Sequence, residues 1–133
     1  MIDDNALNDL VQYRLMRAKE TFNEAILMQR EKHWNACANR LYYACFYSVI
    51  ALLAKNKLSA KKHSGIKALF NQHFIKTGKV NKKKGELFKN LFEARQEGDY
   101  IDFVIFDEAT IAPWINEVND FISTISNLID NGL

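Results

Sequence analysis

The chain has 133 residues, of which 48% are hydrophobic and 26% are charged, and its net charge is +2. This composition is typical of a soluble globular protein and argues against a disordered chain or a membrane protein. We expect one domain over residues 1–133, because a chain near 150 residues buries roughly two-thirds of the surface that it exposes when unfolded.

The sequence gives no sign of secretion or membrane insertion. The first ten residues hold three aspartates and no basic leader, and we find no run of the roughly 20 apolar residues that a bilayer span needs. We therefore expect a cytoplasmic protein with no membrane partner. Cys37 and Cys45 lie eight residues apart on one expected helix, about 12 Å along its axis, which is too far for a disulfide between them.

Charge is distributed unevenly along the chain. Residues 51–100 carry twelve basic and four acidic side chains, whereas residues 101–133 carry six acidic side chains and no basic one. The basic groups concentrate in two lysine clusters beside expected loops, namely Lys55, Lys57, Lys61 and Lys62, then Lys76, Lys79, Lys82, Lys83 and Lys84. Such clusters can attract polyanions. They can equally be solvated loops, or contacts to an acidic partner that include the chain's own last third.

Apolar residues recur at steps of three and four, which predicts helices. The pattern occurs in five segments, at residues 7–29, 34–53, 64–77, 87–98 and 111–129. The fifth is the clearest, because isoleucine or valine follows steps of four and three from Ile111 to Ile129. No segment alternates with a period of two, so strands are not expected.

Local signals predict where these helices begin and end. Ser64 can cap the third helix, and Gly78 and Gly98 can terminate the third and fourth. Pro113 conflicts with a fifth helix that is capped at Asp107, because proline in the second turn removes a backbone hydrogen bond and kinks the axis. We therefore expect this helix to begin near Thr110, or to bend there.

Four long helices and one short helix predict an all-α fold. The short connections favour an antiparallel up-and-down four-helix bundle with an additional short helix in one connection. The chain holds two tryptophans, nine phenylalanines and five tyrosines, more than a narrow four-helix core needs. We therefore expect a homodimer that hides the excess apolar surface in a symmetric interface.

Four stretches carry a resemblance to a known family. They are Asn39-Arg40-Leu41-Tyr42-Tyr43-Ala44-Cys45-Phe46, then His63-Ser64-Gly65-Ile66, then residues 69–78 (LFNQHFIKTG), then Arg95-Gln96-Glu97-Gly98-Asp99-Tyr100. In this order and spacing the chain resembles the HEPN domains of prokaryotes, in particular the stand-alone type that is encoded beside a minimal nucleotidyltransferase. The resemblance implies a homodimeric helical bundle that acts on RNA or a nucleotide, often as the toxin of a toxin-antitoxin pair with a nucleotidyltransferase as antitoxin.

The resemblance also implies a catalytic position. Active members carry an arginine followed after four to six residues by a histidine, and the pair is thought to cut RNA without a metal. Arg95 matches the arginine, but Tyr100 stands where the histidine is expected. A phenol with a pKa of about 10 is a poor general base at neutral pH. The tyrosine therefore weakens the prediction that the protein is a metal-independent endoribonuclease. We assign Arg95 and Tyr100 as the candidate catalytic pair and expect no cofactor.

Arg40, Tyr43 and Tyr47 lie at i, i+3 and i+7 of the second helix and form one stripe. A guanidinium between two phenols can hold a phosphate and stack a base. Alternatively, Arg40 pairs with Asp99 or Glu97. Asp99 can in turn pair with Arg95, and Tyr100 can pack back onto the bundle.

The remaining candidates are histidines and lysines. We expect His63 to serve as a cap or turn residue and His73 to be the substitute base, and three separate histidines predict no metal site. Besides Arg40, Tyr43 and Tyr47, the candidate nucleotide- or RNA-binding residues are Asp99, His73 and the loop lysines Lys79, Lys82, Lys83 and Lys84. The alternative function is a catalytically silent dimeric interaction module that binds a partner protein.

Overall fold

The computed structural model describes residues 3–131, which form five α-helices and one π-helical turn. The helices are α1 (Asp4–Arg30), α2 (Trp34–Lys55), α3 (His63–Phe70), α4 (Lys82–Tyr100) and α5 (Glu108–Asn131), and the π-helical turn η1 (Asn71–Ile75) follows α3 directly. No strand occurs in residues 3–131, which confirms the all-α prediction.

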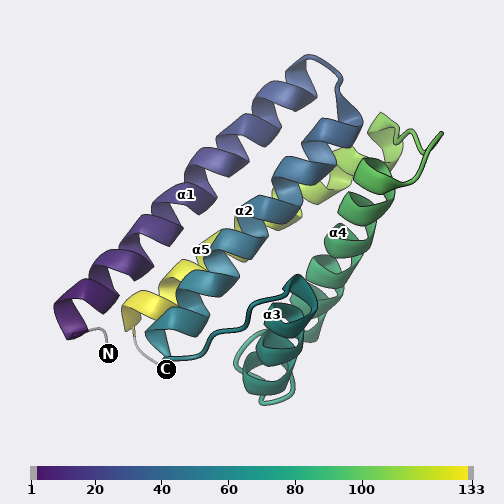
Figure 1. Cartoon of the computed structure of the whole chain (residues 1–133). Helices are drawn as coiled ribbons and strands as arrows, with labels where there is room; N and C mark the ends of the chain where they lie inside the picture. Colours follow the sequence, from purple (N-terminus) through teal and green to yellow (C-terminus); the bar gives the residue numbers. More distant parts are fainter. Residues whose placement is uncertain (1–2, 132–133) are drawn as a thin grey trace.

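Helix α2 is the central element of the fold. It packs against α1, α3, α4 and α5, and Figure 1 shows α1 and α4 on different sides of it. A short turn at residues 31–33 joins α1 to α2, and there Lys32 has a positive φ of 59°. Asn39 near the start of α2 contacts Asp99 near the end of α4, so these two helices run antiparallel.

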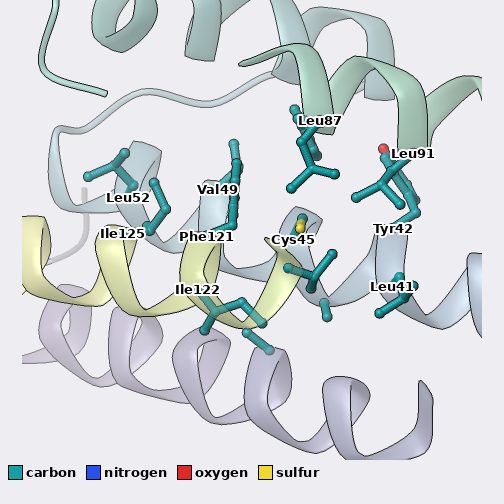
Figure 2. Close-up of a cluster of buried hydrophobic side chains, with 14 of the residues drawn as sticks. Leu41, Tyr42, Cys45, Val49, Leu52, Leu87, Leu91, Phe121, Ile122 and Ile125 are labelled. Carbon is teal, nitrogen blue, oxygen red and sulfur yellow. The ribbon is translucent and has the colours of Figure 1, made fainter. Parts of the chain in front are cut away.

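The core lies between α2 and its neighbours (Figure 2). The central helix contributes Leu41, Tyr42, Cys45, Val49 and Leu52, which lie between Leu87 and Leu91 of α4 and Phe121, Ile122 and Ile125 of α5. The predicted apolar stripe of α5 is confirmed, because all six of its isoleucine and valine positions from Ile111 to Ile129 are buried. Burial of these side chains stabilises the fold by roughly 1.5–3 kcal/mol each.

Helix α2 is also long and apolar enough to meet a simple test for a membrane span, although the sequence analysis found no such segment. Most of this apolar stretch, 61%, is buried inside the fold. A helix that is covered by its neighbours on several sides is apolar all round for that reason.

One expected cap and one expected helix end are wrong. Helix α3 begins at His63, one residue before Ser64, and Lys62 precedes it without a side-chain cap. Helix α4 does not stop at Gly98 but continues to Tyr100. A Cβ atom at Gly98 would lie 3.0 Å from the ring of Phe106, so glycine permits close packing of the following segment here and does not terminate the helix. The expected turn at Gly78 is confirmed by its φ of 79°.

The expected start of α5 near Thr110 is also wrong. The helix begins at Glu108, and the Asp107 carboxylate accepts a hydrogen bond of 2.9 Å from the Thr110 N–H. Hydrogen bonding by the Thr110 side chain, and then by the Thr110 N–H, lowers the pKa of Asp107. Pro113 therefore lies in the second turn, where it removes the helical hydrogen bond to the carbonyl four residues earlier. The up-and-down bundle topology and the homodimer remain predictions.

Candidate functional site

Arg95 lies on the inner face of α4 in a cage of aromatic rings. The residue is only 7% exposed. Its Cζ atom lies 5.1 Å from the ring centroid of Tyr42, 5.7 Å from that of Tyr43, 5.9 Å from that of Phe92 and 5.8 Å from that of Tyr100. Its buried Nε atom has no hydrogen-bond partner, and no ion pair within residues 3–131 involves this guanidinium.

This arrangement is unusual for a side chain that serves only the fold. Burying a charge without a counter-ion costs several kcal/mol, and the attraction of ring faces offsets only part of that cost. Guanidinium groups bind phosphate and carboxylate oxygens strongly, and ring faces accept nucleobases. The cage around Arg95 can therefore bind an anion that carries an aromatic group.

Tyr42 and His63 form a neutral pair beside Arg95. The Tyr42 hydroxyl lies 2.7 Å from His63 Nδ1, and the His63 ring stacks on Phe46 with centroids 4.5 Å apart. Burial raises the pKa of Tyr42 well above its usual value, and the charge of Arg95 offsets part of that rise. Burial, and then the charge of Arg95, lower the pKa of His63, so its ring is neutral at pH 7.

Arg40 belongs to a polar network that connects three helices. It forms an ion pair of 3.0 Å with Glu24 of α1, and it donates to Asn39 Oδ1 at 3.0 and 2.7 Å. Asn39 in turn donates to Asp99 of α4 at 2.8 Å. The alternative in which Arg40 pairs with Asp99 or Glu97 is therefore wrong, since its acidic partner comes from α1 and Asn39 bridges to Asp99.

The ring of Tyr43 joins the two arginines. Arg40 Cζ lies 5.3 Å from its centroid and Arg95 Cζ lies 5.7 Å from it. Tyr47 lies one turn further along α2, where the guanidinium of Arg17 covers its ring at 5.1 Å. Of the predicted stripe, Tyr43 therefore contacts Arg95, whereas Arg40 and Tyr47 contact side chains of α1.

The end of α4 differs from expectation in two ways. Asp99 accepts its hydrogen bond from Asn39 and forms no ion pair with Arg95 within the described chain. Tyr100 does not pack back onto the helices, because it is 74% exposed. Its ring nevertheless lies over the Arg95 guanidinium, so it forms an open wall of the cage.

The loop lysines and His73 are not part of this cluster. Lys82 and Lys83 begin α4, and Arg95 lies about 20 Å along the helix axis from Lys82 at 1.5 Å per residue. Lys84 forms an ion pair of 2.8 Å with Asp120, so for this lysine the contact to the acidic last third is confirmed. Lys79 lies 5.9 Å from the ring of Phe74 in the same region.

His73 lies in η1 and makes none of the ring contacts that surround Arg95. His63 takes the place beside Arg95, and the cap or turn role expected for it is wrong because its side chain bonds Tyr42. No group of three or more His, Cys, Asp or Glu side chains within residues 3–131 is arranged to hold a metal ion.

From the sequence we assigned no binding role to Asn39 and Tyr42, and we expected His63 only as a cap or turn residue. All three lie inside the stretches that carry the family resemblance. A signal was present, because a fully buried tyrosine needs a partner for its hydroxyl and histidine can supply one.

The chain is similar to several known proteins. The family model described as "HEPN domain" matches residues 11–128. A "UPF0332 protein" of Thermotoga maritima is 40% identical over 127 residues, which cover 96% of this chain and 96% of the relative. A "Putative toxin" of Methanocaldococcus jannaschii is 28% identical over 71% of this chain and 70% of its own length, and a second one from that organism is 30% identical over 63% and 57%.

The matched region runs from α1 to the last turns of α5, so it includes every side chain of the Arg95 cluster. The described chain is all-helical, and its Arg40 and Arg95 motifs meet at the ring of Tyr43. With the family match over residues 11–128, the chain belongs to the HEPN domain family.

Proposed function

We propose that this protein is a toxin-like HEPN protein whose Arg95 cage binds RNA or a nucleotide. The observation that carries the proposal is a 7% exposed guanidinium with four rings around it and no carboxylate partner in residues 3–131. The names of the two Methanocaldococcus jannaschii relatives support a toxin-like role. The proposed antitoxin is a nucleotidyltransferase.

The side chains divide into distinct roles in this proposal. Arg95 neutralises a phosphate, and the exposed ring of Tyr100 offers a face for stacking a base. Arg40 already holds the Glu24 carboxylate, so it orients Asn39 and Tyr43 and contributes less charge to the ligand. Tyr47 extends the aromatic surface along α2.

Binding is better supported than cleavage. Tyr100 occupies the position of the motif histidine, and phenols are poor general bases at neutral pH. Loss of a general base typically costs about 10²–10⁴ in rate. We therefore propose that any ribonuclease activity is weak, and that tight binding to RNA is the main property of the site.

The test compares wild type with Arg95→Ala on total RNA. Gel shifts measure binding and gel electrophoresis after incubation measures cleavage, with Arg30→Ala as the control because Arg30 is an exposed arginine in the last turn of α1. We expect Arg95→Ala to lose binding and Arg30→Ala to keep it. Equal binding by all three proteins would remove Arg95 from the function. Binding should also fall with rising salt if phosphates are contacted.

A second function is favoured by the segment between α4 and α5. Ile101, Phe103 and Ile105 are 56%, 100% and 87% exposed, and Phe103 has a positive φ of 66°. The amide of Asn35 holds this segment, because it donates to Val104 O and accepts from Phe106 N–H, both at 2.8 Å. An anchored segment that presents apolar side chains to solvent is typical of a protein interface.

We propose that this segment contributes to the homodimer or to the contact with a partner protein. Light scattering after gel filtration tests it on wild type and Phe103→Ser. The substitution removes no buried contact, so we expect an unchanged melting temperature and a smaller particle. A wild-type protein that is monomeric, or an unchanged particle size, would refute the role in the homodimer.

A further inference from the structure

A second group of cations lies next to the Arg95 cage, in a pocket of about 230 Å³. The pocket is bounded by α1, α2, the start of α3 and residues 58–62 that lead into it. Its ionisable lining residues are all basic, namely Arg14, Lys61, Lys62 and His63. The remainder of the wall consists of Ser59 and of apolar side chains from α2, from residues 58–60 and from α3, among them Phe46. A concave site with cations and no carboxylate favours an anion.

Arg14 resembles Arg95 in forming no ion pair within residues 3–131, although only Arg95 has a buried donor without a partner. Arg14 is half-buried, and burial lowers its pKa. Its guanidinium donates to the backbone oxygen of Ile50 at 3.1 Å and forms no ion pair within the described chain. One carbonyl cannot satisfy the five N–H donors of a guanidinium, so several donors remain for a ligand. Lys61 and Lys62 are exposed and likewise form no ion pair within residues 3–131.

His63 connects this pocket to the cage. It lines the pocket, while its Nδ1 atom is bonded to Tyr42, whose ring lies 5.1 Å from Arg95 Cζ. The buried Tyr42 hydroxyl keeps its proton and has His63 as its hydrogen-bond partner. Donation of that proton to Nδ1 satisfies the phenol and leaves the imidazole proton on Nε2. His63 then offers an N–H donor, which suits a phosphate oxygen.

We propose that the pocket formed by Arg14, Lys61, Lys62 and His63 binds a second phosphate of the same oligoribonucleotide whose first phosphate lies at Arg95. This inference rests on the proposed function and goes beyond it, because it assigns a ligand with two phosphates and places them on the two sides of His63. The ring of Phe46, on which His63 stacks, lies in the wall of this pocket.

The experiment uses two dinucleotides, ApA with one phosphate and pApA with two. Isothermal titration calorimetry at low salt measures both on wild type and on the double variant Lys61→Ala/Lys62→Ala. The control double variant is Lys19→Ala/Lys89→Ala, which removes the same charge from two exposed lysines outside this pocket. Both lysines of the test pair are exposed, so the test variant is expected to fold.

We expect wild type and the control to bind pApA about tenfold more tightly than ApA, because charge-assisted hydrogen bonds to the second phosphate add to the affinity. The test variant should lose that preference and keep its affinity for ApA. Equal affinities of wild type for the two ligands, or a preference that survives in the test variant, would overturn the second pocket alone. Failure of wild type to bind either ligand would overturn both this inference and the proposed RNA or nucleotide binding.

Discussion

Replacement of Arg95 by methionine tests whether this arginine serves ligand binding or the stability of the fold. Methionine has a similar reach and is apolar, so it can fill the space among Tyr42, Tyr43 and Phe92 without a charge. If Arg95 is present for a ligand, the variant should be at least as stable as wild type while binding is lost. If Arg95 is present for the fold, the variant should be less stable.

The distances in the structure give the expected change in the free energy of unfolding. The four ring contacts span 5.1–5.9 Å, close to the outer limit of about 6 Å, so each contributes about 0.5 kcal/mol and together about 2 kcal/mol. The desolvation of an unpaired ion costs several kcal/mol. We therefore expect Arg95→Met to raise the free energy of unfolding by about 1–2 kcal/mol. With a typical urea m-value, the midpoint should move upward by about 0.5–1 M.

Urea unfolding followed by circular dichroism measures this change, with Lys89→Met as the control because Lys89 is an exposed cation on the same helix. The pKa of His63, followed by NMR, gives an independent result. Since the charge of Arg95 lowers that pKa, it should rise toward 6.5 in Arg95→Met. A variant destabilised by more than about 1 kcal/mol would refute the argument, because the rings would then compensate the charge fully.

Three further predictions concern the surroundings of the site. The pKa of His63 in the folded protein is held below 6.5, so the unfolded chain takes up a proton first as the pH falls. Thermal melts should therefore show that the stability of wild type declines below about pH 6.5 and that the stability of His63→Gln declines less. Equal slopes would contradict the depressed pKa. Asn35→Ala removes two hydrogen bonds of 2.8 Å, so we expect a loss of about 1–3 kcal/mol in urea unfolding and faster amide exchange at Phe106; an unchanged exchange rate would contradict the anchoring role. Burial raises the pKa of Cys37 to about 11 and that of Cys45 well above its usual value, so neither thiol should react with Ellman's reagent at pH 8 before unfolding, and rapid labelling of the native protein would contradict their burial.

Much of the fold could be predicted because burial repeats with the helical period. The stripe of α5 from Ile111 to Ile129 is a property of one helix, and the spacing of its residues alone indicates the buried face. The ends of helices are different, because they depend on contacts with other segments. Gly98 has the local character of a helix stop, yet the ring of Phe106 packs where a side chain would otherwise lie.

The site was predictable only in part, for the same reason. Arg40 and Arg95 were found from two short motifs, and the structure brings both to the ring of Tyr43. Their partners come from elsewhere, since Glu24 of α1 neutralises Arg40 and His63 of α3 binds Tyr42. A sequence motif gives the residues of one helix, but the choice of a partner across helices depends on tertiary packing.

Whether an arginine forms an ion pair indicates its availability to a ligand better than the number of arginines does. Arg17 and Arg40 form ion pairs with Glu20 and Glu24, so a ligand would have to displace a carboxylate to use them fully. Arg14 and Arg95 are at least half-buried and form no such pair within residues 3–131, although burial makes a missing counter-ion most costly for them. Both lie beside the neutral pair of Tyr42 and His63. An anionic ligand that spans this pair would supply the two missing counter-ions together, and this provides a physical reason for the fold to retain both charges.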